Sequence, residues 1–197
     1  MTKEFSFNGD VKGLIFDCDG TLVDSMPLHM KAWQEAFKQF NERYDKDFLF
    51  SLKGMKETEI IELYNREFRT SINPAEIVTA KHEYFIRHIA DVKPIKPVVD
   101  IVKSYYNKLP LAVVSGSVKE IVHSELNVIG IHDLFNVILT ADDPFKPKPD
   151  PEIFFAAASR MNIMPENCIV FEDGDPGLDA AVKAGMQTID VRNYLGK

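Results

Sequence analysis

The chain of 197 residues is long enough for one ample domain, or for a core that carries a smaller insertion. Its 45% hydrophobic content supports a packed core, and its net charge of −7 argues against a general nucleic-acid-binding surface. The two cysteines form no metal-binding pair, which favours a reducing compartment. Residues 1–12 lack an apolar leader region, and no apolar run approaches the roughly 20 residues of a membrane span. We therefore expect a cytoplasmic protein without a membrane partner.

The first predicted strand, about residues 11–17, runs directly into two aspartates. Asp17 and Asp19 flank Cys18 and precede a glycine. An unpaired buried carboxylate is costly, so such a pair indicates a cation or a strong hydrogen-bond network. Mg²⁺ fits better than a transition metal because no histidine ligand stands near. The alternative is that this run only forms a turn. Cys18 is not expected to be a nucleophile, because no histidine is placed to activate it.

Residues 26–92 are predicted to be helical throughout. After Pro27, apolar side chains recur every fourth residue, which is the spacing of one helix face: Leu28, Ala32, Ala36 and Phe40. A second helix is predicted to begin near Lys56. A third is predicted from Asn73, an N-cap that precedes Pro74 at the first helical position. We expect the aromatic side chains of this segment to form the core of a helix bundle.

Beyond Pro97, short apolar strands alternate with helices. The predicted strands cover about residues 111–114, 137–140, 169–171 and 188–191, and the predicted helices cover 98–107, 151–161 and 176–184. Another helix follows Ser117, which has capping-box spacing with Glu120. The alternation predicts an α/β fold, a Rossmann-like parallel sheet covered on both faces. Residues 1–25 and 93–197 would form the catalytic core, and residues 26–92 an inserted helical cap.

Polar residues follow several of these strands. In an open parallel sheet, ligands bind beyond the carboxyl ends of the strands, so these residues should form one site. Four segments carry them: Asp17 and Asp19, Ser115-Gly116-Ser117, Lys146-Pro147-Lys148-Pro149, and Glu172-Asp173-Gly174-Asp175. Hydroxyls and backbone N–H groups at a helix start suit an oxyanion. Together with carboxylates and a fixed lysine, they make the set that phosphoryl transfer needs.

In this order, the four segments resemble the motifs of the haloacid dehalogenase superfamily. Asp17-Cys18-Asp19-Gly20-Thr21 is similar to the first motif, Ser115 to the second, Lys146 in Lys-Pro-x-Pro-Asp to the third, and Glu172-Asp173-Gly174-Asp175 to the fourth. The resemblance covers essentially the whole chain. It is strongest to the beta-phosphoglucomutase-like subgroup, particularly its small fructose-1-phosphate phosphatases. It implies a phosphatase that hydrolyses small sugar phosphates with the help of Mg²⁺.

The resemblance also implies chemical roles for the acidic motif residues. Asp17 would attack phosphorus and form an aspartyl phosphate. Asp19 would protonate the departing sugar oxygen and later accept a proton from the attacking water. The implied metal ligands are the Asp17 carboxylate, the main-chain carbonyl of Asp19, and Asp173, with Glu172 nearby.

The same resemblance assigns the groups that bind phosphate. Ser115, the amide of Gly116 and Lys146 would hold the phosphoryl oxygens. The motif needs only one lysine, so Lys148 is expected to be a solvated loop residue. Asp175 is expected to cap the helix that follows it rather than to bind a metal.

Two further substrate-binding candidates lie in the predicted cap. His29 resembles a histidine that assists the mutase near its acid–base aspartate, but a partly exposed helix position fits it equally well. Lys53 belongs to a Leu-Lys-Gly turn in the cap loop that is expected to determine specificity. The other histidines form no ligand cluster and are expected at the surface: His82, His88, His123 and His132.

Isomerisation of the beta-phosphoglucomutase type is the main alternative function. The mutase resemblance puts an arginine for a second phosphate shortly after Leu-Lys-Gly. This chain has Lys53 and Lys56, point charges without the bidentate fork of arginine, so net hydrolysis is favoured. Three other functions are disfavoured. A dehalogenase needs neither an acid such as Asp19 nor a metal ligand. A signalling receiver has the motifs in the reverse order, and an inactive scaffold would lack part of the catalytic set. We expect a small phosphorylated sugar as substrate, no nucleic-acid partner, and a monomer or weak dimer.

Overall fold

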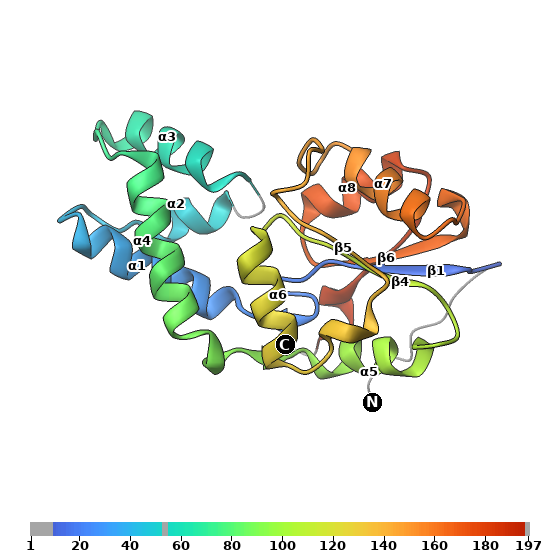
Figure 1. Cartoon of the computed structure of the whole chain (residues 1–197). Helices are drawn as coiled ribbons and strands as arrows, with labels where there is room; N and C mark the ends of the chain where they lie inside the picture. Colours follow the sequence, from blue (N-terminus) through green and yellow to red (C-terminus); the bar gives the residue numbers. More distant parts are fainter. Residues whose placement is uncertain (1–9, 53–54, 196–197) are drawn as a thin grey trace.

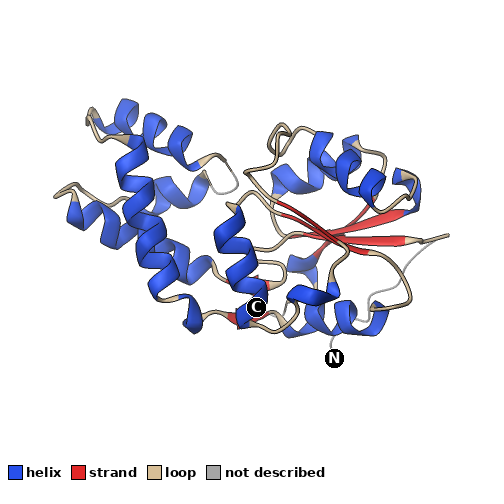
Figure 2. Cartoon of the chain, viewed as in Figure 1, coloured by secondary structure: helices blue, strands red, loops and turns tan. Residues whose placement is uncertain are grey.

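A five-stranded parallel sheet forms the centre of the computed structural model, which describes residues 10–52 and 55–195. The strands are β1 (Gly13–Phe16), β4 (Leu111–Val114), β5 (Val137–Leu139), β6 (Cys168–Glu172) and β7 (Gln187–Asp190), in the order β5-β4-β1-β6-β7. Figure 2 shows the sheet in red between two layers of helices. β1 lies in the middle, paired in parallel with β4 and β6. β1, β4 and β6 are short, mostly apolar and fully buried, which is typical of a sheet covered on both faces. The α/β fold predicted from the sequence is confirmed.

Helices cover both faces of the sheet (Figure 1). α5 (Lys96–Tyr105) and α6 (Lys119–Val128) pack on one face through side chains such as Val98 and Leu126. α7 (Glu152–Arg160) and α8 (Asp175–Lys183) pack on the other through side chains such as Phe154 and Ala180. Short 3₁₀ helices occur at Ile89–Asp91, His132–Leu134, Pro165–Asn167 and Val191–Asn193. These two apolar layers hold the strands rigidly, which also fixes the positions of the residues that follow them.

Four helices form a group beside the sheet, here called the helical unit (Figure 1). They are α1 (Met26–Gln39), α2 (Lys46–Ser51), α3 (Glu57–Phe68) and α4 (Pro74–Arg87). Phe37, Tyr64 and Ile77 are fully buried in its own apolar core. At the start of α4, the Asn73 side chain accepts two backbone N–H hydrogen bonds, as an N-cap should. The six-residue α2 was not predicted, because so short a helix leaves no repeat in the sequence.

Two short strands join the helical unit to the sheet. β2 (Val23–Asp24) and β3 (Lys93–Pro94) pair antiparallel. Beside them, the N–H of Ile95 donates to the carbonyl of Leu22 at 2.8 Å. The chain therefore enters and leaves the helical unit through adjacent, hydrogen-bonded segments. Two-residue strands carry no alternation pattern, so the sequence did not predict them. Within the described ranges, every helix is too short or too polar to cross a membrane.

One carboxyl group is buried beneath the loop of the first motif. Glu125 of α6 is fully buried, and its Oε2 accepts a hydrogen bond from the Cys18 thiol at 3.3 Å. Its Oε1 has no hydrogen-bond partner among the described residues. Burial raises the pKa of Glu125 well above its ordinary value, and the nearby negative charge of Asp19 acts in the same direction. Burial therefore favours the neutral acid form of Glu125.

Replacement of Glu125 by glutamine should stabilise the fold at high pH. The folded protein keeps the Glu125 proton at pH values where an unfolded glutamate, with a pKa of about 4.3, has lost it. The free energy of unfolding of the wild type should therefore fall as the pH rises above about 4.3. Because glutamine stays neutral, Glu125→Gln should melt at a higher temperature at pH 8, by about 2–4 °C per kcal/mol removed. Thermal melts in EDTA between pH 4 and pH 8 measure the difference. A difference that does not shrink toward pH 4 contradicts a neutral Glu125.

Candidate active site

Three parallel strands end at one edge of the sheet and bring the residues there together. Asp17 follows β1, Ser115 follows β4 and Glu172 ends β6, and all three are buried. The main chain fixes them, because the N–H of Asp17 donates to the Phe171 carbonyl and the N–H of Ser115 to the Leu139 carbonyl, each at 2.9 Å. The sheet thus joins three motifs that are far apart in the sequence.

An acidic cluster occupies this edge. Carboxylate oxygens of Asp17, Glu172 and Asp173 all lie within 4.8 Å of one another. Burial raises the pKa of Asp17 well above its ordinary value, and the charge of Glu172 adds to the effect. Converging buried carboxylates repel one another unless a cation lies between them. Because all these donors are oxygens, the cluster fits a hard divalent cation such as Mg²⁺.

Two glycines make room for this cluster. A Cβ on Gly177 would lie 1.9 Å from Oε2 of Glu172, so a side chain at this turn of α8 would displace that carboxylate. Gly20 has a φ of +83°, and a Cβ there would lie 2.6 Å from Oδ2 of Asp173. Glycine tolerates both the left-handed backbone and the close approach. Gly20 in the first motif and Gly177 shortly after the fourth therefore define the space for the acidic side chains.

Lys148 is the lysine that enters the site. Its Nζ lies 2.8 Å from Oδ1 of Asp17 and 2.7 Å from Oε2 of Glu172, and it also donates to the Val114 carbonyl at 3.0 Å. The side chain is 9% exposed, and its Nζ lies 5.5 Å from the centre of the Phe154 ring. A buried ammonium with two carboxylate partners and a carbonyl partner has its hydrogen bonds satisfied.

The prediction that Lys146 holds the site is wrong. The Lys146 side chain is 72% exposed and pairs with Asp150 at 3.7 Å. Lys148, expected to be the solvated one, is the buried one. Each lysine is followed directly by a proline, and the motif alone did not show which of the two side chains is buried. The N–H of Asp150 donates to the Pro147 carbonyl at 3.0 Å, and the turn so closed contains Lys148.

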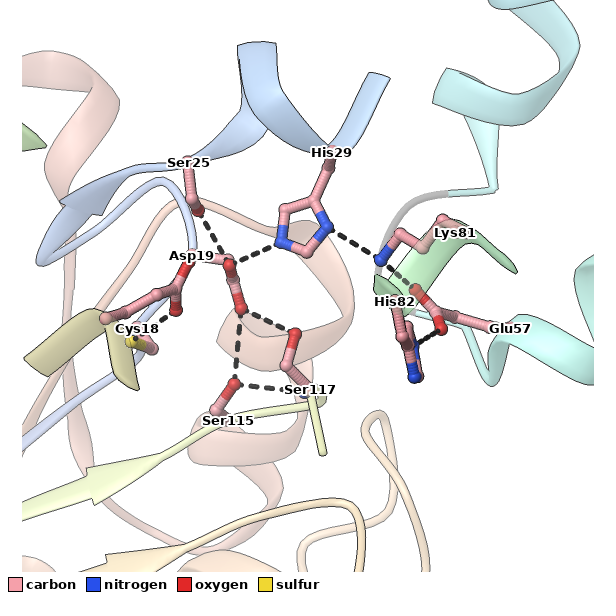
Figure 3. A network of polar contacts seen from close by, with 10 residues as sticks. Cys18, Asp19, Ser25, His29, Glu57, Lys81, His82, Ser115 and Ser117 are labelled. Carbon is pink, nitrogen blue, oxygen red and sulfur yellow. Dashed lines mark hydrogen bonds and ion pairs between the residues drawn. The ribbon is translucent and has the colours of Figure 1, made fainter. Parts of the chain in front are cut away.

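Asp19 lies in a different environment from Asp17 (Figure 3). Its Oδ1 accepts hydrogen bonds from Ser25 Oγ and contacts His29 Nε2, each at 2.7 Å. Its Oδ2 accepts from Ser117 Oγ at 2.7 Å and from Ser115 Oγ at 3.4 Å. The carboxylate of Asp19 is therefore occupied by hydroxyl and imidazole groups. The main-chain carbonyl of Asp19, which was its predicted metal-binding group, takes no part in these side-chain contacts.

The predicted capping box at Ser117 and Glu120 is not formed. α6 begins at Lys119 with Val118 in the N-cap position and without a side-chain cap. The N–H of Lys119 instead donates to Oδ2 of Asp142 at 2.7 Å. Ser117 binds Asp19 rather than its own helix, and its N–H donates to Ser115 Oγ at 3.0 Å. Ser117 therefore binds Asp19, a residue distant in sequence, instead of forming the local capping box with Glu120.

The expected capping role of Asp175 is also wrong. Gly174 is the N-cap of α8, and Asp175 is the first helical residue, paired with Arg192 at 2.7 Å. Asp150 does receive a hydrogen bond at the start of α7, from the N–H of Glu152 at 3.0 Å. Neither aspartate belongs to the acidic cluster at the end of β6.

His29 connects Asp19 to the helical unit. The residue is 8% exposed, so the alternative of a partly exposed surface histidine is wrong. Its Nδ1 lies 2.8 Å from Nζ of Lys81. An ammonium group can only donate, so Nδ1 accepts and the proton of a neutral ring stands on Nε2. His29 therefore donates to Asp19. Burial and Lys81 both lower the pKa of His29, which favours this neutral form.

The contacts continue through residues that the sequence analysis missed (Figure 3). Lys81 is fully buried near the rings of Trp33 and Phe85, and its Nζ lies 2.5 Å from Oε1 of Glu57. Oε2 of Glu57 binds Nε2 of His82, which was expected at the surface. Burial opposes ionisation of Glu57, but Lys81 and His82 lower the pKa of Glu57 to about 2. One sequence signal could have revealed these contacts: Lys81 is a lysine on the otherwise apolar face of α4.

Asp19 is held as an anion by these neighbours. Burial alone would raise the pKa of Asp19, but His29 and the hydrogen bonds from Ser25 and Ser117 lower it well below its ordinary value. Asp17, two residues earlier, has its pKa shifted in the opposite direction. Two neighbouring aspartates with opposite shifts are suited to different chemical tasks.

Two cavities lie between the helical unit and the sheet edge. The first, of about 130 Å³, contains Asp17, Asp19 and His29 among its lining residues. The second, of about 280 Å³, borders Ser115, Thr140 and His82. They share a smaller set of lining residues: Glu57, Gly116, Ser117 and Lys148. Lys53, predicted to bind substrate, lies outside the described residues.

Known proteins resemble the chain in both sequence and structure. It is 36% identical over 181 residues to the fructose-1-phosphate phosphatase YqaB of Escherichia coli (strain K12), covering 91% of this chain and 96% of that protein. It is 29% identical over 186 residues to a 6-phosphogluconate phosphatase of the same organism, covering 90% and 80% of the two chains. The solved beta-phosphoglucomutase of Clostridium difficile has a TM-score of 0.75 and 31% identity, covering 90% of this chain and 83% of that one. The haloacid dehalogenase-like hydrolase family matches residues 14–191. With its four motifs gathered at one sheet edge and this match over most of its length, the chain belongs to the haloacid dehalogenase-like hydrolase family.

Proposed function

We propose that this enzyme hydrolyses small sugar phosphates through an aspartyl phosphate on Asp17, with Asp19 as acid and base and Mg²⁺ as cofactor. The contrast between the two aspartates carries the proposal. Asp17 lies among carboxylates and a buried lysine, which suit a metal ion and a phosphoryl group. Asp19 lies among serine hydroxyls and an imidazole, which suit the transfer of a proton.

In the first half-reaction, an oxygen of Asp17 forms a bond to phosphorus while the bond from phosphorus to the sugar oxygen breaks. Although burial lowers the pKa of Lys148, Asp17 and Glu172 raise it above its ordinary value, so the ammonium stays charged. Lys148, the Ser115 hydroxyl and the amide of Gly116 would stabilise the phosphoryl oxygens. The departing sugar oxygen takes the proton of Asp19.

In the second half-reaction, the oxygen of a water molecule bonds to phosphorus and the bond to Asp17 breaks. The Asp19 carboxylate accepts the proton of that water. Its hydrogen bonds from His29 and Ser117 suit the anionic form needed at this point. A phosphate dianion beside Asp19 would raise its pKa before the first half-reaction, because like charges disfavour ionisation. Asp19 then begins each turnover as the acid.

The acidic cluster accounts for the proposed cofactor. Asp17, Glu172 and Asp173 offer only oxygen ligands. Burial and, after it, the charge of Glu172 raise the pKa of Asp17, and a further cation at this site would oppose both effects. Bound there with the main-chain carbonyl of Asp19, Mg²⁺ would neutralise charge on the phosphoryl oxygens. Thr21 Oγ1 donates to Oδ1 of Asp173 at 3.1 Å and so orients that carboxylate.

The leaving group is proposed to be a small sugar, with fructose 1-phosphate as the first candidate. The similarity to a fructose-1-phosphate phosphatase along almost the full length of both proteins supports this choice. Beta-phosphoglucomutase-type isomerisation remains the alternative, supported by the similar mutase structure. We infer that residues 26–92 act as a cap on the core formed by residues 1–25 and 93–197, and that the enzyme works as a monomer or weak dimer.

A phosphate-release screen tests the proposed function. Wild-type enzyme with Mg²⁺ should release phosphate from hexose and pentose phosphates, and EDTA should abolish the release. Asp17→Asn lacks the nucleophilic carboxylate and should lose at least about a thousandfold in kcat while keeping its melting temperature. Conversion of glucose 1-phosphate into an isomer without release of phosphate would instead support the mutase. Undiminished turnover by Asp17→Asn would contradict the assigned nucleophile.

The two lysines of the third motif provide a matched pair. Lys148→Met removes the ammonium that contacts Asp17 and Glu172, and we expect kcat/KM to fall by about 10²–10³-fold. Lys146→Met changes only an exposed side chain and should stay within about twofold of the wild type. Steady-state kinetics of both variants measure the difference. A larger loss in Lys146→Met than in Lys148→Met would restore the original sequence assignment.

A substitution at Asp19 should affect the two half-reactions differently. Asp19→Asn removes the acid and the base, so hydrolysis of a sugar phosphate should slow by about 10²–10⁴-fold. With p-nitrophenyl phosphate, whose leaving group needs little protonation, the first half-reaction should remain fast. Stopped-flow absorbance should therefore record a burst of p-nitrophenolate followed by slow turnover. The absence of a burst, with steady rates equal to those of the wild type on both substrates, would rule out the acid–base role.

A further inference from the structure

The first cavity is where the leaving group of the proposed reaction must lie, because Asp19 has to reach the ester oxygen there. On the sheet side it is lined by the site residues already described. On the side of the helical unit its lining is mostly apolar, with His29 and Glu57 as the polar residues; the apolar ones are Met26, Met30, Trp33, Leu49, Met55 and Ile60. Such a wall can pack against the C–H groups of a sugar, but it offers no partner to an anion.

The cations that line this cavity are already engaged. Among the described residues, they are Lys148, paired with Asp17 and Glu172, and His29, whose two ring nitrogens contact Asp19 and Lys81. Lys56 borders the second cavity instead. The described lining of the first cavity therefore leaves no uncommitted positive charge for a second anionic group.

Glu57 is the acidic residue that the helical unit contributes to this lining. It stands at the first position of α3 and lines both cavities. Lys81 binds one of its carboxylate oxygens and His82 the other. Lys81 is fully buried and outside the lining of either cavity, whereas His82 borders the second cavity. Lys81 and His82 thus fix the Glu57 carboxylate in the lining of the cavity proposed for the leaving group.

We propose that Glu57 is a specificity-determining residue, which limits the leaving group to neutral sugars or polyols and disfavours esters that carry a second phosphate or a carboxylate. The inference rests on the proposed function and adds the charge of the accepted substrate to it. A carboxylate can accept hydrogen bonds from sugar hydroxyls. It repels a second anion in a partly dehydrated cavity, where the interaction of like charges is stronger than in water.

Two pairs of esters that differ in one anionic group test the inference. Fructose 1-phosphate is compared with fructose 1,6-bisphosphate, and glucose 6-phosphate with 6-phosphogluconate. For the wild type, we expect kcat/KM to be at least about tenfold higher for the neutral leaving group in each pair. Glu57→Gln keeps an acceptor for Lys81 but removes the negative charge, so this ratio should fall by about tenfold.

Two further variants separate charge from folding. Glu57→Asp keeps the carboxylate, and its ratio should stay close to that of the wild type. Glu59→Gln alters an exposed acid on the same helix and should change neither the ratio nor the activity. A ratio near one in the wild type, or an unchanged ratio in Glu57→Gln, overturns the inference while the proposed function stands. If wild-type enzyme hydrolyses none of the four esters, the proposed function fails and the inference falls with it.

Discussion

The ion pairs of Lys148 with Asp17 and Glu172 are the interaction on which the site depends. The parallel sheet brings carboxylates from β1 and β6 to one edge, where burial and mutual repulsion act against their charges. An isolated buried charge is costly, so the two carboxylates need the ammonium between them. The turn that contains Lys148, the glycines beside the acidic cluster and the rigid strand ends all serve this arrangement. It leaves a site suited to one further divalent cation and a phosphoryl group.

The helical unit contributes to the site through charge as well as shape. His29 reaches Asp19 from α1, Lys81 of α4 fixes the tautomer of His29, and Glu57 of α3 fixes Lys81. Each contact joins a different element, so this series of hydrogen bonds requires the helices to pack as they do. The same series ends on the carboxylate that faces the leaving group. Proton transfer at Asp19 and discrimination among substrates would then share one structural support.

Local sequence patterns gave wrong predictions where a contact between residues distant in the sequence had replaced a local contact. Ser117 has the spacing of a capping box, yet it binds Asp19 because a buried carboxylate needs donors more than a solvated helix end does. Lys146 and Lys148 each precede a proline, and only the fold of the turn decides which one is buried. Lys81 and Glu125 could not be located from spacing, because their partners come from other helices and loops.

The sequence by itself determined the α/β class, the chain order of the five sheet strands and the longer helices, and the identity of the acidic residues. These follow from apolar runs and from motifs a few residues long, whose physical causes are local. Only the tertiary structure decided which lysine neutralises Asp17, which groups surround Asp19, and which acid lines the leaving-group cavity. Those outcomes depend on distances between segments up to 131 residues apart, such as Asp17 and Lys148. Burial sets the cost of each unpaired charge there, and burial is a property of the whole fold.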